Sequence, residues 1–249
     1  MKKANLVYRK PEFYIEENRY EDTKDMFLFL SHLMSKKYNT AESLTISDHG
    51  CAAGELTYHL QKVFTNSSIT GYDVDVDLLE KAKTIMPNSN FILGSVLEKN
   101  TCLPRTSDIS ICIGVIQIFD NFEETIDNLL AWTKPGGSVY LHGLFNNFPL
   151  DVDIKYNHSS DRSNGIKERG WNLFSKESVS RYLEEQTNIE EYGFYDFEIS
   201  VDLEMKEDKT HNFIRSWTMN DAFGKRIITN GLNLMQPHSI LEIKLLEEE

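Results

Sequence analysis

The 249-residue sequence has few cysteines, a deficit of positive charge and no long apolar run. Its three cysteines show no paired spacing, which argues against a disulfide framework and favours reduced thiols in the cytoplasm. No segment approaches the roughly 20 apolar residues that span a bilayer, and the lysines at the start precede no apolar stretch, so we expect neither a membrane span nor a signal peptide. The 26 basic residues face 39 acidic ones, and the net charge of −13 disfavours nucleic acid as a partner. Histidines and carboxylates show no metal-ligand spacing, so we expect no metal.

A hydrophobic content of 40% and a charged content of 26% are typical of a globular protein, and the length favours one domain over residues 1–249. Short apolar runs alternate with segments of helical periodicity, which predicts an α/β fold. We expect a helical cap over residues 1–42, a core over 43–143 and an acceptor side over 144–249. Predicted strands cover residues 43–47, 68–73, 90–93, 107–114, 138–142, 192–203 and 240–246. Predicted helices cover residues 22–37, 55–64, 76–86, 122–133 and 175–186.

A turn of small residues, Gly50-Cys51-Ala52-Ala53-Gly54, joins the first predicted strand to a helix. Its two glycines let a ligand approach the backbone closely, and the N-terminus of the helix offers unpaired N–H groups. Asp73 ends the next predicted strand, where its carboxylate can accept hydrogen bonds from both hydroxyls of a ribose. This order of strand, glycine turn, helix and acid predicts a nucleotide site.

The turn distinguishes two nucleotide classes. A dinucleotide site prefers G-x-G-x-x-G, but Ala52 replaces the middle glycine here, which disfavours NAD. The turn after Asp48 instead resembles the D-x-G-C-x-x-G loop of class I S-adenosylmethionine (SAM) dependent methyltransferases. The resemblance continues in the order of that family through GYDVDVDLLEKAK, NFILGS, DISICIGVIQIFDN and KPGG. It implies a Rossmann-like fold with a seven-stranded, mostly parallel sheet flanked by helices, an N-terminal helical lid and two insertions after strand five.

The same resemblance implies SAM as the cofactor and S-adenosylhomocysteine as its product. It assigns cofactor binding to Asp48, Gly50, Cys51, Ala52, Gly54, Asp73, Val74, Gly94, Ser95, Val96, Gly114 and Val115. Ser95 stands where the family commonly has an acid, and His49 follows Asp48 where an aliphatic residue is usual. N-terminal helices often cover the SAM pocket in this family, so Tyr8, Tyr14 and Tyr20 are pocket candidates.

Two long polar segments, residues 143–174 and 204–237, follow the fifth predicted strand. Ligands of open α/β sheets bind beyond the carboxyl ends of the strands, so we expect these insertions to form the acceptor pocket. The substrate-binding candidates are Gln117, Asn146, Tyr156, Trp171, Arg215 and Trp217. The alternative is structural for each, since a tryptophan is more often a core anchor and an arginine an ion-pair partner. The set suits a small, polar acceptor that is anionic or sugar-like.

His142 ends the fifth predicted strand, beside the expected position of the methyl group. It is the candidate catalytic base for a hydroxyl acceptor, with a buried structural histidine as the alternative. Gln117 can orient an acceptor but cannot act as a base.

Three further segments, GLFNNFPLDVDIKY, GWNLFSKES and RSWTMNDAFGKRIITNGLN, resemble bacterial methyltransferases encoded with surface-polysaccharide genes. This resemblance implies O-methylation of a sugar or a polysaccharide precursor. Two alternatives stay open: N- or carboxyl-methylation of a small natural-product intermediate, and a non-catalytic SAM-binding or assembly subunit. The oligomeric state is also open, with a homodimer as one alternative.

Overall fold

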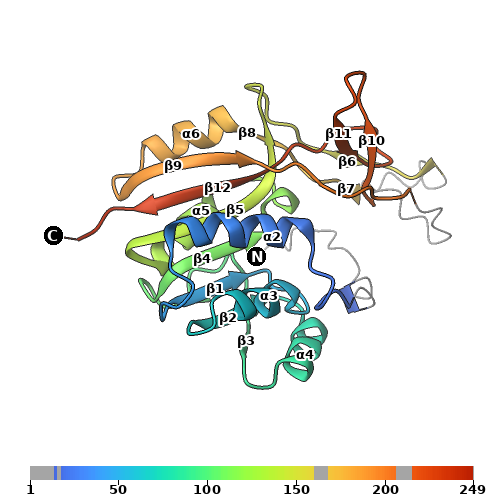
Figure 1. Ribbon diagram of the computed structural model, residues 1–249. Coiled ribbons are helices and arrows are strands. Elements are labelled where there is room, and N and C mark those ends of the chain that lie inside the picture. Colours follow the sequence, from blue (N-terminus) through green and yellow to red (C-terminus); the bar gives the residue numbers. More distant parts are fainter. Residues whose placement is uncertain (1–13, 16–17, 160–167, 206–214, 249) are drawn as a thin grey trace.

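One central sheet organises the chain, whose computed structural model describes residues 14–15, 18–159, 168–205 and 215–248 (Figure 1). The strand order is β3-β2-β1-β4-β5-β12-β9, and β8 pairs with β5 beside this path. The strands are β1 Thr45–His49, β2 Ser68–Asp73, β3 Asn90–Leu93, β4 Ser107–Ile113, β5 Thr133–Asn146, β8 Phe174–Ser175, β9 Ile189–Asp196 and β12 His238–Leu245. Strand β12 runs antiparallel to β5 and β9, and the pairs from β3 to β5 are parallel. The predicted seven-stranded, mostly parallel sheet is confirmed.

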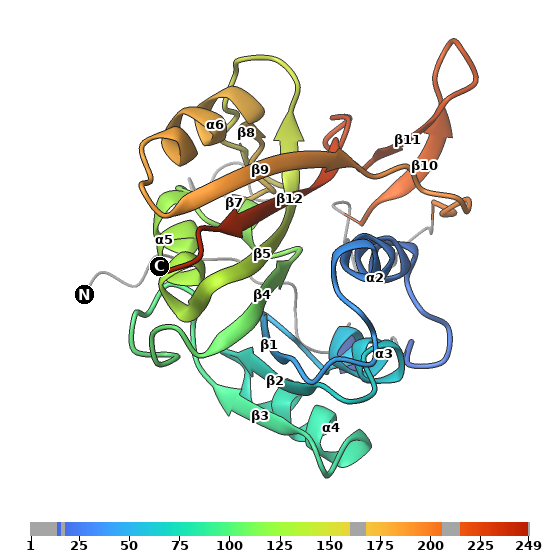
Figure 2. The same cartoon turned by 60° about the vertical axis from the view of Figure 1, so that its left-hand side comes forward.

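Helices cover both faces of the sheet (Figure 2). Helices α2 (Asp25–Lys37) and α3 (Glu55–Val63) lie on one face, and α5 (Glu123–Trp132) and α6 (Lys176–Glu184) on the other. Helix α4 (Val76–Ile85) packs beside the glycine turn. The sequence supplies the expected helix starts: Ser175 Oγ caps α6 by accepting from Ser178 N at 2.9 Å, and acidic residues occupy the first turn of α5.

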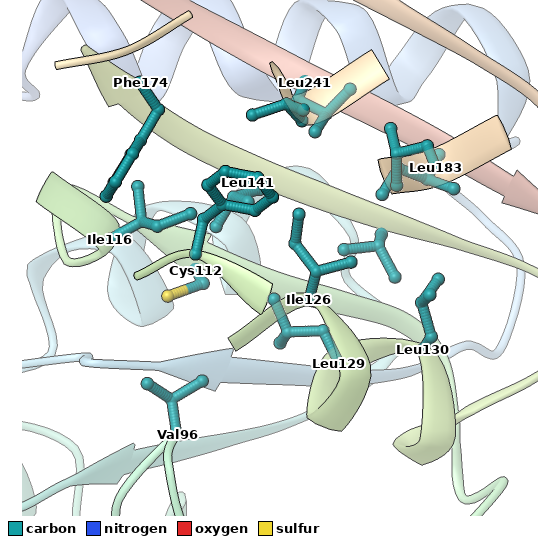
Figure 3. Packing of buried hydrophobic residues seen from close by; sticks show 14 of the residues in the cluster. Val96, Cys112, Ile116, Ile126, Leu129, Leu130, Leu141, Phe174, Leu183 and Leu241 are labelled. Carbon is teal, nitrogen blue, oxygen red and sulfur yellow. The ribbon is translucent and has the colours of Figure 1, made fainter. Parts of the chain in front are cut away.

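The central strands are buried on both sides, which explains the nearly apolar sequence of β4. Figure 3 shows the cluster in which side chains of the sheet meet α5 and α6; its labelled members include Cys112, Leu141, Leu241, Ile126, Leu129 and Leu183. A second cluster on the other face joins α2 and α3 to the sheet through Leu30, Leu60, Ile46, Ile111 and Tyr140. Each fully buried aliphatic side chain stabilises the fold by about 1.5–3 kcal/mol.

Two strands differ clearly from their predicted bounds. Strand β9 ends at Asp196 instead of residue 203, because the chain leaves the sheet after Phe197 N donates to His238 O at 2.9 Å. The next residues approach α2 instead, where Ser200 N donates to Asp25 Oδ2 at 3.0 Å. Strand β5 begins at Thr133, which pairs with Ser107, and a register shift accommodates the Pro-Gly-Gly turn that we expected to precede it.

Both insertions contain short strand pairs. The first carries β6 (Lys155–Tyr156) and β7 (Glu168–Arg169), and the second carries the hairpin β10 (Trp217–Asn220) and β11 (Arg226–Thr229). They meet around a small apolar cavity lined by Ile154 and Trp171 from the first insertion and by Leu232 and Leu234 from the second. No helix in the described part of the chain is long and apolar enough to cross a membrane.

Candidate functional site

The turn between β1 and α3 brings backbone groups to the carboxyl edge of the sheet. Gly50 and Gly54 have φ values of +81° and +83°, a region that favours glycine, and Ala52 adopts φ +48°. A Cβ on Gly50 would lie 2.3 Å from Val115 Cγ2, so the turn after β1 packs directly against the loop after β4. Gly54 is the N-cap of α3, and no side chain caps this helix. The N–H groups of its first turn are therefore available to a ligand.

Asp73 is fixed beside this turn at the end of β2. Its Oδ2 accepts from Ala52 N at 2.8 Å and its Oδ1 from Asp75 N at 3.0 Å. Burial raises the pKa of this carboxyl, and the backbone hydrogen bonds oppose that change. Each oxygen retains a lone pair for a further hydrogen bond, so the carboxylate can still hold a ribose. Val74, which follows it, is exposed and can contact the base.

Asp48 and His49, the last two residues of β1 before the turn, are both buried. Asp48 Oδ2 accepts from Thr57 Oγ1 at 2.8 Å, which ties β1 to α3, and burial raises the pKa of Asp48 to about 7. His49 lies on the opposite face of the sheet, stacked between Tyr72 and Trp132 at centroid distances of 4.9 and 4.6 Å. Neither ring nitrogen of His49 has a hydrogen-bond partner among the described residues.

The loop after β3 lies beside Asp73, since Gly94 N donates to Asp73 O at 2.9 Å. The half-buried Ser95 accepts from Leu97 N through its hydroxyl at 3.2 Å. Val96 is buried in the α5 cluster, and its carbonyl accepts from Asn128 Nδ2 at 2.8 Å. Val96 therefore supports this loop from inside the fold, and its predicted contact with the cofactor stays a prediction.

Tyr20 and Lys24, which precede α2, lie against the glycine turn and the first turn of α3. Tyr20 is buried and donates its hydroxyl to Ala53 O at 2.7 Å. Lys24 forms an ion pair with Glu55 at 2.7 Å, in the first turn of α3. Cys51 is buried beneath the turn, where burial raises the pKa of its thiol and keeps it neutral. Tyr14 contributes its carbonyl to Lys81 at 3.2 Å, and Tyr8 lies outside the described residues.

The side chains of Gln117 and His142 meet beside Gly114, which comes immediately after β4. Gly114 has φ +76°, and a Cβ on it would meet only Gln117 Nε2 and His142 Nδ1, each at 3.9 Å. Both side chains are buried, and neither Gln117 Oε1 nor His142 Nδ1 has a hydrogen-bond partner in the described part of the chain. Two predicted residues, His142 of β5 and Gln117 of the loop after β4, thus lie close together beside Gly114.

His142 has a partner that the sequence did not reveal. Its Nε2 lies 2.9 Å from His238 Nδ1, and the two rings are nearly parallel, with an interplanar angle of 7°. Burial lowers the pKa of His142 well below its usual value and that of His238 to about 4. Both rings are therefore neutral at pH 7, and His142 would hold an abstracted proton only weakly. The antiparallel pairing of β5 with β12 creates this contact, which no local motif signals.

The remaining acceptor candidates are distributed over the insertions. Both amide atoms of Asn146 bond within its own turn, to Leu150 O and Phe148 N. Tyr156 donates to Glu168 Oε2 at 2.7 Å across the β6–β7 pair. Trp171 lines the small cavity between the insertions. Half-buried Arg215 and Trp217 lie at the β10 hairpin, where Trp217 lines a shallow groove with residues 202–205. Their contact with substrate stays a prediction.

Asn172 anchors the first insertion to the loop after β4. Its backbone N donates to Gln117 O at 2.8 Å, and its side chain bonds Phe119 O and Ile154 N at 2.8 and 2.9 Å. The first insertion is thus hydrogen-bonded directly to Gln117, whose side chain lies beside Gly114. Within the ranges described above, no group of histidines, cysteines and carboxylates could hold a metal ion.

Comparison with known proteins agrees with this geometry. The family model described as a methyltransferase domain matches residues 16–188. The chain is 29% identical over 167 residues to a malonyl-[acyl-carrier protein] O-methyltransferase of Halalkalibacterium halodurans, with 62% of this chain and 60% of that protein covered. A trans-aconitate 2-methyltransferase of Rhodopseudomonas palustris is 27% identical over 92 residues, which cover 37% of this chain and 35% of that protein.

The fold also matches solved structures. The crystal structure of the PH0226 protein of Pyrococcus horikoshii superposes with a TM-score of 0.58 at 14% identity. That match covers 96% of this chain and all of the other chain. The chain thus spans about 60% of the length of the first curated relative but the whole length of this structural neighbour.

Proposed function

The chain belongs to the methyltransferase domain family and is a SAM-dependent methyltransferase, and we propose that it methylates a carboxylate oxygen of a small polar acceptor. This choice departs from the sugar hydroxyl that the polysaccharide-locus resemblance implied. It takes the carboxyl alternative that the sequence left open.

The residues on the cofactor side fit SAM. The glycine turn offers N–H groups close to Val115, and Asp73 can accept from the ribose hydroxyls while Val74 contacts the base. When bound, SAM would supply an activated methyl group on its sulfonium sulfur, and S-adenosylhomocysteine would be the product that remains after transfer. The protein has to orient the acceptor and exclude water. Tyr20 is buried against the turn, where its hydroxyl donates to Ala53 O.

The single observation that carries the proposal is that two uncharged side chains, those of His142 and Gln117, meet beside Gly114. Burial keeps the pKa of His142 well below its usual value. A sugar hydroxyl must lose its proton during transfer, and a base this weak assists that loss poorly. A carboxylate is already ionised at neutral pH and needs only hydrogen-bond donors to hold it. Neutral imidazole and amide groups can provide them.

The relatives agree with a carboxylate acceptor. Malonyl and trans-aconitate, named in the two curated relatives, both contain free carboxylates, whereas neither name contains a sugar. The first match covers 60% of that protein, so a carboxylate acceptor does not follow from it and is a proposal for this chain. A non-catalytic subunit is disfavoured because Gly50, Gly54 and Asp73 all keep the geometry that binds a nucleotide.

The test is a transfer assay with methyl-labelled SAM and four acceptors: trans-aconitate, a malonyl thioester, a nucleotide sugar and histamine. We expect label in trans-aconitate or the malonyl thioester. The product should release methanol in mild base, because methyl esters hydrolyse there while methyl ethers and N-methyl groups do not. Label found only in the sugar, in a base-stable form, would overturn the carboxylate proposal. A melting-temperature shift with S-adenosylhomocysteine but not with NAD provides the control for the cofactor.

A further inference from the structure

The His142–His238 pair contains two buried ring nitrogens whose protonation the methyl-transfer chemistry above does not specify. His142 Nε2 and His238 Nδ1 share one hydrogen bond at 2.9 Å. The outer nitrogens, His142 Nδ1 and His238 Nε2, are buried without a partner in the described part of the chain. One proton occupies the shared bond, so its direction determines which outer nitrogen carries an N–H and which has a bare lone pair.

Two neutral arrangements are possible. If His142 donates in the shared bond, His142 Nδ1 is a bare acceptor and His238 Nε2 becomes a buried N–H without an acceptor. If His238 donates, His238 Nε2 is bare and His142 Nδ1 carries the N–H. Buried N–H groups without a partner are rare in folded proteins. The second arrangement leaves no N–H without an acceptor at His238. It places the free N–H on His142 Nδ1, beside Gly114, where a ligand can accept a hydrogen bond from it.

The surroundings favour the second arrangement. The ring of Phe197 meets His238 edge to face at a centroid distance of 6.5 Å, and His238 Nε2 is buried without a hydrogen-bond partner among the described residues. His142 Nδ1, in contrast, lies 3.9 Å from the point where a Cβ of Gly114 would stand. Gln117 Nε2 lies at the same distance from that point. With His238 as donor, two uncharged N–H donors, one from β5 and one from the loop after β4, lie beside Gly114.

We propose that His238 is a positioning residue, which donates its Nδ1–H to His142 Nε2 and thereby fixes His142 Nδ1 as an N–H donor to the acceptor carboxylate. Gln117 supplies the second donor. This inference deepens the carboxylate proposal and rests on it for the identity of the anion. Uncharged donors bind a carboxylate less strongly than a guanidinium does, so the pair orients the oxygen while leaving it nucleophilic. His238 thus contributes to acceptor specificity without touching the acceptor.

Nitrogen NMR of the histidine rings tests the arrangement directly and requires no turnover. Long-range proton–nitrogen spectra of the folded protein at pH 7 distinguish a protonated ring nitrogen from a bare one. We expect His142 Nδ1 and His238 Nδ1 to be protonated and His142 Nε2 and His238 Nε2 to be bare. Adding trans-aconitate to the S-adenosylhomocysteine complex should shift the His142 Nδ1–H signal. A bare Nδ1 on His142, or a signal that trans-aconitate leaves unchanged, would refute the proposal.

Two substitutions of His238 separate positioning from packing. In His238→Asn the amide can occupy the place of Nδ1 and donate to His142, whereas His238→Leu fills space without a donor. His238→Leu should raise KM for trans-aconitate at least tenfold and leave S-adenosylhomocysteine affinity within threefold. His238→Asn should restore KM to within threefold of the wild type. His59→Leu is the matched control, since His59 of α3 is buried and hydrogen-bonded to Ser31 of α2, outside the site.

The outcomes distinguish the two proposals. If no carboxylate is methylated but His142 Nδ1 is protonated and responds to trans-aconitate, the proposed function fails and the role of His238 stands. If carboxylates are methylated and His238→Leu behaves like His59→Leu, the role of His238 fails and the proposed function stands. Equal defects in His238→Asn and His238→Leu would assign His238 to packing alone and refute its positioning role.

Discussion

Replacing His49 by phenylalanine should make the protein more resistant to acid. The His49 ring is stacked between Tyr72 and Trp132, and both of its nitrogens are buried without partners in the described part of the chain. Burial lowers the pKa of His49 from 6.5 to about 3. The unfolded chain therefore binds a proton that the folded chain excludes, so the free energy of unfolding falls as the pH decreases from 6.5 towards 3.

The magnitude follows from the size of this pKa change. One pKa unit corresponds to about 1.4 kcal/mol. At pH 5 only the interval between the unfolded-state pKa of 6.5 and pH 5 has lowered the free energy of unfolding. Between pH 7 and pH 5 the wild type should lose about 2 kcal/mol through His49 alone. That is a large fraction of the 5–15 kcal/mol typical of a folded domain. Phenylalanine keeps the aromatic stack and cannot be protonated.

The total pH dependence would hide this effect, because Asp48 acts in the opposite direction. Its pKa is raised to about 7 by burial, so the folded state binds its proton first and gains stability as the pH decreases through that value. The measurement must therefore compare His49→Phe with the wild type, since Asp48, His142 and His238 contribute to both proteins and cancel in the difference. Urea unfolding followed by circular dichroism at pH 7 and pH 5 gives the two free energies.

We expect the stability of His49→Phe relative to the wild type to rise by about 2 kcal/mol between pH 7 and pH 5. Leu60→Ala is the control, because it creates a cavity in the core on the other face of the sheet without removing a titratable group. Its difference from the wild type should not depend on pH. A difference for His49→Phe that is equally constant would show that the folded protein accepts a proton on His49, and the reasoning from burial would be wrong.

Two further predictions concern the cofactor side. Asp73→Ala should weaken S-adenosylhomocysteine binding by about 2 kcal/mol, or roughly thirtyfold, because a charged acceptor of hydrogen bonds is lost; unchanged affinity in calorimetry would contradict the ribose role. Gly50→Ala should abolish most of the melting-temperature shift with S-adenosylhomocysteine, because its Cβ would lie 2.3 Å from Val115 Cγ2 at φ +81°. Adding Val115→Ala should restore part of that shift by removing the clash but not the backbone strain. Equal shifts in the single and double variants would show that the clash has no effect.

The cofactor side could be predicted from sequence because its determinants are local. Strand β2 (Ser68–Asp73) and strand β3 (Asn90–Leu93) have the predicted bounds, and α3 begins at the predicted Glu55. Apolar runs, glycines with positive φ and a strand-terminal acid are each visible within a few residues. The resemblance added the order of these segments, which fixed the topology of the sheet.

Predictions failed where a distant segment determines the local structure. The alternation of apolar residues continues past Asp196, yet Phe197 leaves the ladder and contacts Phe29 of α2 at a centroid distance of 5.6 Å. The periodicity of the sequence cannot reveal that the side chain of Phe197 packs against α2 instead of continuing the strand beside β12. The anchoring bonds of Asn172 to Phe119 O and Ile154 N likewise depend on how the first insertion folds back, which the residue type alone does not reveal.

The pairing of His142 with His238 illustrates why acceptor chemistry is harder to predict than cofactor chemistry. The two residues are separated by 96 positions and meet only because β12 returns antiparallel to β5, with Ile240 opposite His142. Considered alone, His142 at a strand end is a plausible general base. Beside the second buried imidazole of His238 it is a neutral group. The direction of the hydrogen bond between the two rings then determines whether His142 Nδ1 is a donor or an acceptor. A change of acceptor in such a protein therefore requires no change in the glycine turn or in Asp73, because the residues that orient the acceptor belong to segments that the cofactor does not constrain.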